Sequence, residues 1–168
     1  MFQSRRRRAT LTLTLIVFVS ASAVCPAQEK PTDGLTDGDK AEIVRLTLER
    51  ALVKREIPDY DYIKDLKQVL ISNKNIKTEL LPKFDGIGFA LLKPEEIEER
   101  AERVAGSYIY FLEFGKFKVE DAKVMVDLNH YPKYNRKPGI MAFGGALVFE
   151  CQRQDGKWAC EVKYRVIV

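Results

Sequence analysis

The stretch AFGGALVFECQRQDGKWACEVKYRVIV, residues 142–168, decides the fold. Two alternating runs flank Asp155-Gly156, a dipeptide that favours a type I′ turn because both central residues of that turn need positive φ. The sequence therefore predicts a β-hairpin in which Cys151 lies opposite Cys160 as a non-hydrogen-bonded pair. Such a pair is close to the lower edge of the spacing that a disulfide spans. We expect a disulfide there; two buried free thiols are the alternative.

The same register divides the side chains of the hairpin between two faces of a sheet. The face expected to be apolar carries Leu147, Phe149, Cys151, Trp158, Cys160, Val162, Tyr164 and Val166. The more polar face carries Val148, Glu150, Gln152, Ala159, Glu161, Lys163 and Arg165. Both strands sort independently in this way, which supports the pairing and predicts that the apolar face points inward, against helices.

The N-terminus has the organisation of a secretory signal peptide over residues 1–27. Four arginines, Arg5 to Arg8, precede an apolar run and a zone of small residues, with cleavage expected after Ala23 or Ala27. The apolar run is shorter than the roughly 20 residues of a membrane span. Val24 before Cys25 argues against a lipoprotein anchor, and the arginine run leaves a twin-arginine route open. We therefore expect an exported protein, periplasmic or secreted, with a disordered linker over 28–38 and a single domain over 39–168.

Charge and cysteine usage agree with export. The segment 1–27 holds four of the 28 basic residues and none of the 24 acidic ones, so the remainder has 24 of each. A chain with equal numbers of basic and acidic residues lacks the excess positive charge of a nucleic-acid-binding protein, so no nucleic-acid partner is expected. Cleavage after Ala27 also removes Cys25 and leaves Cys151 and Cys160 as a pair in an oxidising compartment.

The rest of the chain reads as helices first and strands later. A helix is expected from Asp39, with Asp39 and Glu42 at capping-box spacing, ending near Arg55 before Pro58. A short helical turn over 59–63, a strand over 66–72 and a bent strand or loop over 84–92 follow. A second helix is expected over 94–104, and strands over 108–114, 118–129, 140–152 and 158–168. The order predicts an α+β domain with the helices on one face of a curved antiparallel sheet.

This order resembles the nuclear-transport-factor-two-like superfamily, which includes ketosteroid isomerase. The segments that carry the resemblance are 66–82, 91–102 and 144–168, with Asp-Gly-Lys-Trp (residues 155–158) before the last strand. The resemblance implies a cone-shaped fold in which the sheet wraps the helices and leaves a pocket. It implies no activity, because one fold carries many functions. No ketosteroid-isomerase catalytic residue can be matched to a position of this chain.

Candidate pocket residues follow from the inferred inner face, from the turn after the first helix and, for Asp127, from its closeness to His130. They are Asp61, Tyr62, Asp127, Phe149, Trp158 and Tyr164. A carboxylate beside an apolar cavity can act as an acid or base because burial shifts its pKa. The alternatives are a capped turn for Asp61 and Tyr62, and ordinary core for the three aromatic residues. His130, the single histidine, could act as a general base with Asp127 on the same face, or be a solvated loop residue.

No metal site and no cofactor are predicted, because one histidine and two paired cysteines offer few ligands and no phosphate loop or nucleophile elbow is present. The first expectation for function is an exported module that binds a small apolar ligand or a protein partner. The alternative is a small-molecule isomerase, cyclase or hydrolase that uses a pocket carboxylate. A third is a structural protein that forms a homodimer through the outer sheet face. Whether the chain is an enzyme is left open at this point.

Overall fold

The computed structural model describes residues 34–58, 60–63, 66–104, 108–134 and 144–167. The predicted signal peptide, both predicted cleavage sites and most of the predicted linker lie outside these residues. The helices are α1 (Asp37–Leu48), which continues into the π-helical turn η1 (Glu49–Val53), and α2 (Pro94–Arg103); short 3₁₀ turns are η2 (Tyr60–Tyr62), η3 (Leu66–Gln68) and η4 (Thr78–Leu80). The strands are β1 (Val69–Ser72), β2 (Phe89–Leu92), β3 (Tyr108–Phe114), β4 (Lys118–Glu120), β5 (Lys123–Tyr134), β6 (Gly145–Gln154) and β7 (Lys157–Ile167).

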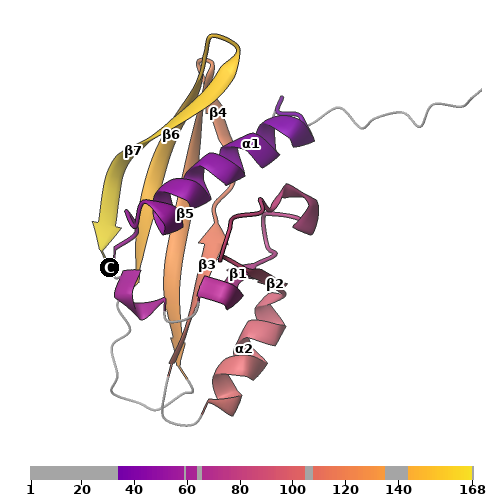
Figure 1. Ribbon diagram of the computed structural model, residues 1–168, viewed down its shortest axis with the longest axis vertical. Coiled ribbons are helices and arrows are strands. Elements are labelled where there is room, and N and C mark those ends of the chain that lie inside the picture. The colour runs from indigo at the N-terminus through magenta and orange to yellow at the C-terminus, as the bar shows by residue number, and fades with distance from the viewer. Residues whose placement is uncertain (1–33, 59, 64–65, 105–107, 135–143, 168) are drawn as a thin grey trace, which may run out of the picture.

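These strands form one curved open sheet in the order β2-β1-β3-β5-β6-β7, with β4 paired to β5 (Figure 1). The α+β class is as predicted, but the sheet is mixed, because β1 runs parallel to both β2 and β3. Only β3 to β7 are antiparallel. The prediction of a wholly antiparallel sheet is therefore wrong. Parallel neighbours need a crossover connection, and the chain between β1 and β2 supplies one through the short turn η4.

The closing hairpin forms in the predicted register. Asp155 and Gly156 both have positive φ, 50° and 79°, as a type I′ turn requires. Cys151 pairs with Cys160 across the ladder, the two Cα atoms are 4.1 Å apart, and a disulfide joins the residues. The predicted disulfide is confirmed.

A bulge in β7 changes the facing of its second half. Phe149 pairs with Val162, but the next residue of β6, Val148, pairs with Tyr164, so Lys163 is an extra residue on β7. Beyond Lys163 the alternation of β7 is therefore shifted by one position. Tyr164 and its neighbour Val166 lie on the face that carries Val148, and the prediction that they point inward is wrong.

We call the face that carries Val126, Leu128 and Phe149 the inner face, and the opposite face the outer face. The helix α1 crosses β5, β6 and β7 in Figure 1, and its buried residues belong to the same hydrophobic core as the inner-face residues. The shared core includes Ile43, Val44, Leu48, Leu112, Phe114, Val126, Leu128, Leu147, Phe149 and Trp158. The main core is thus a single layer between α1 and the inner face of the sheet.

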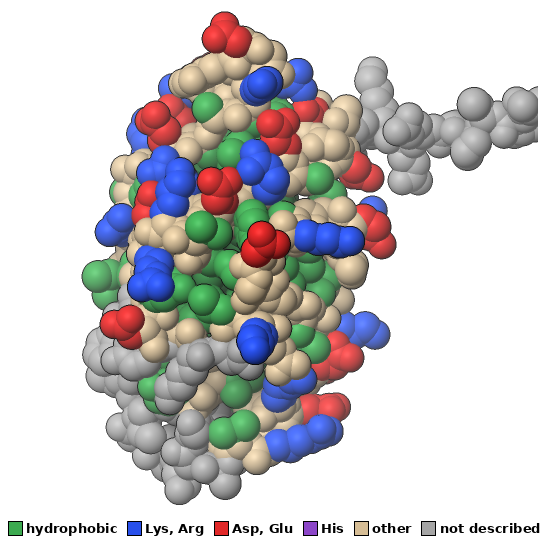
Figure 2. Space-filling model, in the orientation of Figure 1, with side chains coloured by type: hydrophobic (Ala, Val, Ile, Leu, Met, Phe, Trp, Pro, Cys, Tyr) green, Lys and Arg blue, Asp and Glu red, His purple; other side chains and the backbone are tan. Residues whose placement is uncertain are grey.

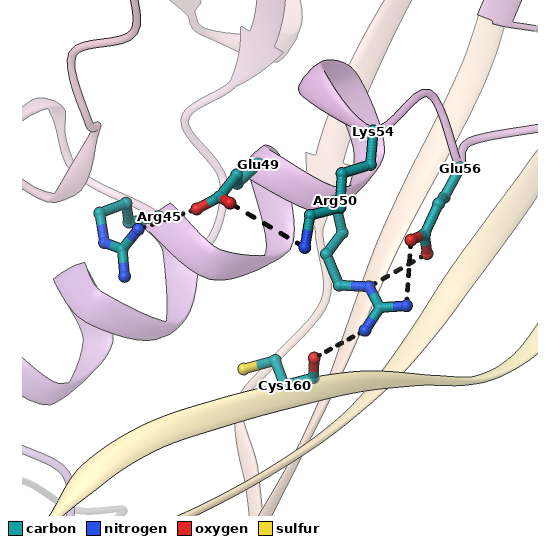
Figure 3. A network of polar contacts seen from close by, with 6 residues as sticks. All are labelled: Arg45, Glu49, Arg50, Lys54, Glu56 and Cys160. Atoms are coloured by element: carbon teal, nitrogen blue, oxygen red, sulfur yellow. Dashed lines mark hydrogen bonds and ion pairs between the residues drawn. The ribbon is translucent and has the colours of Figure 1, made fainter.

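Polar contacts fix both ends of the first helix. Thr36 caps it: its side chain accepts from the Asp39 N–H (3.1 Å), and the Asp39 carboxylate accepts from the Thr36 N–H (3.1 Å). This capping box lies three residues earlier than the predicted pair of Asp39 and Glu42. At the other end, Arg50 holds Glu56 through two nitrogens (3.0 Å each) and donates to the Cys160 carbonyl (3.2 Å), which ties η1 to β7 (Figure 3).

The second helix lies toward the outer face, at the end of the sheet where β1 to β3 are found. Leu70 is buried although it alternates with the core residues Val69 and Ile71, so its side chain faces the outer layer. The Lys133 ammonium contacts Glu98 of α2 at 2.8 Å. Lys133 is five positions from the inner-face residue Leu128 along β5, so its side chain is on the outer face. The connection from β1 to β2 and the connection from β2 to β3 run in opposite directions across the sheet. Because crossovers between parallel strands are right-handed as a rule, the two connections are expected on opposite faces. This arrangement differs from the prediction that both helices share one face.

Charged side chains of both signs are interspersed over the side of the molecule shown in Figure 2. Where α1 meets η1, Arg45 and Glu49 form an ion pair at 2.9 Å. Among the described residues, no helix is long and apolar enough to cross a membrane.

Candidate functional site

The candidate site is a hollow of about 560 Å³ on the outer face of β5, β6 and β7, which we call the outer pocket. Its lining residues come from these three strands and from Gly144, just before β6. They are Asp127, Asn129, Tyr131 and Pro132 of β5, Gly144, Gly145, Ala146 and Val148 in and before β6, and Tyr164 and Val166 of β7.

The hollow arises from a difference in side-chain size across the three strands. The ladder places Asp127, Val148 and Tyr164 in one row and Asn129, Ala146 and Val166 in the next. The middle strand therefore contributes the smaller side chains, preceded by Gly145. Larger side chains on β5 and β7, above all Tyr131 and Tyr164, form the walls.

Asp127 is the charged residue of the outer pocket. Its side chain is half-buried, and its backbone carbonyl accepts from the Gly115 N–H at 2.7 Å. A Cβ on Gly115 would lie 3.0 Å from the Asp127 Cβ and 3.1 Å from Oδ2, so glycine leaves the space that this carboxylate uses. Within the part of the chain that the structure describes, no N–H, hydroxyl or ammonium donates to the Asp127 carboxylate.

The neighbouring acidic side chains differ from Asp127 because each has a lysine partner. Glu150 binds Lys123 at 2.9 Å and Lys163 at 2.8 Å. These hydrogen bonds, that of Lys163 first, lower the pKa of Glu150, and the same contact raises the pKa of Lys163. Glu113 binds Lys74 at 3.2 Å. Lys74, Lys123 and Lys163 are therefore already engaged.

Asn129 and Tyr131 are held in place by β3. The Asn129 amide donates to the Glu113 carbonyl at 3.3 Å. The Tyr131 ring packs on Phe111 with centroids 5.6 Å apart, and 39% of Tyr131 remains exposed. Burial raises the pKa of Tyr131, with further contributions from the charges of Glu113 and Asp127. Its hydroxyl is therefore protonated at neutral pH and available as a hydrogen-bond donor.

The structure divides the predicted pocket residues into separate groups. Asp127 and Tyr164 meet in the outer pocket. Phe149 and Trp158 lie in the core on the other side of the sheet, with exposures of 0% and 9%. Asp61 is exposed in η2, and the side chain of Tyr62 lies outside what the structure describes.

His130 lies in neither of the predicted settings. The strand β5 continues to Tyr134, so His130 is inside the strand, where it is 3% exposed. It is three positions from Asp127 and thus on the opposite face, where its ladder partner is Gly145. A Cβ on Gly145 would lie 2.4 Å from His130 Nε2, so the glycine makes room for the imidazole. The prediction that His130 and Asp127 share a face is wrong, and so is the solvated-loop alternative.

Sequence reasoning missed Asn129, Tyr131, Ala146 and Val148 as pocket residues. Alternation along β5 from Asp127 indicates the first two once the strand is extended past residue 129. Ala146 and Val148 are neighbours of Asp127 only through the pairing of β5 with β6, which local sequence does not report.

The described residues contain no group of three or more His, Cys, Asp or Glu side chains that could hold a metal ion. The chain matches no protein-family model, no curated protein and no solved structure.

Proposed function

We propose that this protein is an exported binding module whose outer pocket holds a ligand or a segment of a partner protein. The observation that carries the proposal is the Asp127 carboxylate, which is half-buried beside apolar side chains and receives no donor from the described residues. A partly desolvated carboxylate without a partner is unfavourable, and a bound donor would remove that cost.

The rim of the pocket supports the same proposal. Tyr131, Tyr164 and Val166 are 39%, 54% and 37% exposed, and they belong to one continuous surface. Contiguous apolar surface with a polar group at its centre is typical of an interaction site on a soluble domain.

The enzymatic alternative has less support. An isomerase or hydrolase that works through one carboxylate needs that group enclosed, so that its proton affinity is tuned and water is excluded. Asp127 is open to solvent on one side, and Asp61 is exposed. The two aromatic residues expected to wall a cavity beneath the helices, Phe149 and Trp158, are packed in the core instead.

Export and superfamily membership are part of the proposal. The disulfide between Cys151 and Cys160 supports an oxidising compartment. The curved sheet with a long helix across its inner face is compatible with a nuclear-transport-factor-two-like cone. In that case the binding site of this chain would be on the outer side of the cone.

Native mass spectrometry of the protein purified from its own host tests the proposal. We expect the wild type to retain a bound molecule, Val166→Lys to lose it, and Val119→Lys to keep it. Val119 is a matched control because it is also an exposed strand valine, on β4 and 45% exposed. Loss of the bound molecule in both variants, or retention in both, would contradict the assignment of the site.

A further inference from the structure

We propose that the occupant of the outer pocket is a polypeptide segment that presents a lysine or arginine side chain next to an apolar residue. This inference rests on the proposed function and names the partner for the same site. It uses three observations: the charge of Asp127, the two tyrosine walls and the position of β7 in the sheet.

Charge complementarity selects a cation. The acidic neighbours Glu113 and Glu150 are compensated by lysines of this chain, whereas the described residues supply no cation to Asp127. An ammonium or guanidinium group from outside would form a charge-assisted hydrogen bond with this carboxylate. The rings of Tyr131 and Tyr164 at the pocket walls favour the same kind of group, because aromatic faces attract cations.

Shape selects an amphipathic side chain. Beside the carboxylate, Ala146, Val148 and Val166 are apolar. The methylene stem of lysine or arginine can pack on such a surface while its charged end reaches the acid. A metal ion or a small inorganic cation would leave this apolar surface uncovered.

The position of β7 selects a polypeptide over a small molecule. This strand is the last in the sheet order, and Tyr164, Val166 and Ile167 on it are exposed. A segment that lies across the outer face of β7, over Tyr164 and Val166, would cover the exposed rim of the pocket and bring one side chain to Asp127, whereas a small ligand would leave the rim exposed.

Fluorescence anisotropy with two labelled peptides tests the inference. The probes are Gly-Leu-Lys-Phe-Gly and its neutral analogue Gly-Leu-Gln-Phe-Gly, both with blocked ends, and the protein is the full exported chain. We expect the lysine peptide to bind wild type about tenfold more tightly than the glutamine peptide, as one charge-assisted hydrogen bond predicts. Asp127→Asn should abolish this difference, whereas Asp61→Asn, which removes an exposed acid outside the pocket, should leave it unchanged. Thermal unfolding of both variants checks that they are folded.

Other outcomes overturn the inference in distinguishable ways. If both peptides bind with equal affinity and Val166→Lys weakens both, the proposed function stands but the pocket does not select a cationic side chain. n-Butylammonium that displaces the peptide at an affinity equal to that of the peptide would show a small-molecule site. Self-association that depends on Val166, measured by analytical ultracentrifugation, would assign the surface to a second copy of this chain. If neither peptide binds but a host molecule is still retained in the native mass spectrum, the polypeptide occupant is rejected and the proposed binding function stands.

Discussion

At the scale of single residues, Asp39 joins elements that are far apart in the sequence. Its carboxylate completes the cap of α1, accepts from the Trp158 Nε1–H at 2.9 Å and contacts the Arg153 guanidinium. The hydrogen bond from Trp158 is the main cause that lowers the pKa of Asp39 from 3.8 to about 2, with Thr36 and Arg153 adding to it and burial opposing it. Asp39 therefore links the start of the first helix to the tip of the closing hairpin.

Because the pKa of Asp39 is lower in the folded state than in the unfolded state, its ionised form favours folding. This contribution is complete above about pH 4 and is lost as the pH falls toward 2. We predict that Asp39→Asn removes about 1–2 kcal/mol of this acid dependence, after allowance for solvent screening. Urea unfolding at pH 6 and pH 2.5 measures it. Asp61→Asn should keep the wild-type difference between the two pH values, and an unchanged difference in Asp39→Asn would reject the link.

At the scale of elements, the closing hairpin combines a local turn with a covalent bond. The disulfide closes a short loop, because Cys151 and Cys160 are nine positions apart. We predict that the double substitution Cys151→Ala and Cys160→Ala lowers the free energy of unfolding by about 2–3 kcal/mol, the loop-closure value for this length. Equilibrium unfolding in guanidinium chloride measures the change, and the wild type under reducing conditions is the matched comparison. Non-reducing peptide mapping that finds two free thiols in the protein purified from its own host would contradict the disulfide itself.

The elements also show what sequence can predict. The hairpin, its register up to Val162 and the bounds of β3 follow from turn chemistry and alternation within a few neighbouring residues. The turn between β4 and β5 was missed because Asp121 and Ala122 adopt positive φ (44° and 65°) without glycine. The parallel pairing of β1 with β3 depends on contacts between residues some 40 positions apart, for example Ile71 with Leu112, and no local pattern encodes it.

The candidate site was predictable only in part, for the same reason. Strand alternation in the hairpin predicts Tyr164 as a pocket residue, and closeness to His130 predicts Asp127, but the pocket expected for them lies beneath the helices. The bulge at Lys163 shifts Tyr164 to the outer face, and a run of alternating residues does not reveal an inserted one. The pocket is therefore a product of strand pairing, which places side chains of β5, β6 and β7 in common rows.

At the scale of the whole molecule, the two ends of the sheet are stabilised to different extents. The strands β5 and β6 lie inside the sheet and carry fully buried core residues, among them Val126, Leu147 and Phe149. At the other end, β2 is a four-residue edge strand that is half-buried throughout. The buried side chains of α2 within the described residues are Ile97 and Ala101. The most stable part of the molecule is therefore expected to consist of β5, β6, β7 and α1.

We predict that native-state hydrogen exchange separates these regions. Amides in the centres of β5 and β6 should exchange only through global unfolding, whereas those of β2 and α2 should exchange through a smaller opening at lower free energy. Exchange monitored by NMR at increasing, sub-denaturing urea concentrations distinguishes the two, since global opening is the more sensitive to urea. Identical free energies and urea dependences for both regions would show that the sheet unfolds as one unit.

The extra residue in β7 has a consequence for how this chain can diversify. The first half of the strand is committed to the interior through Trp158 and Cys160, while the second half displays Tyr164 and Val166 to the surroundings. Those two positions can therefore change with little penalty to folding, and a single-codon deletion at Lys163 would remove the bulge while leaving Tyr164 opposite Val148 and Val166 opposite Ala146. Variation among natural versions of the chain should thus concentrate after position 163 and be sparse before it.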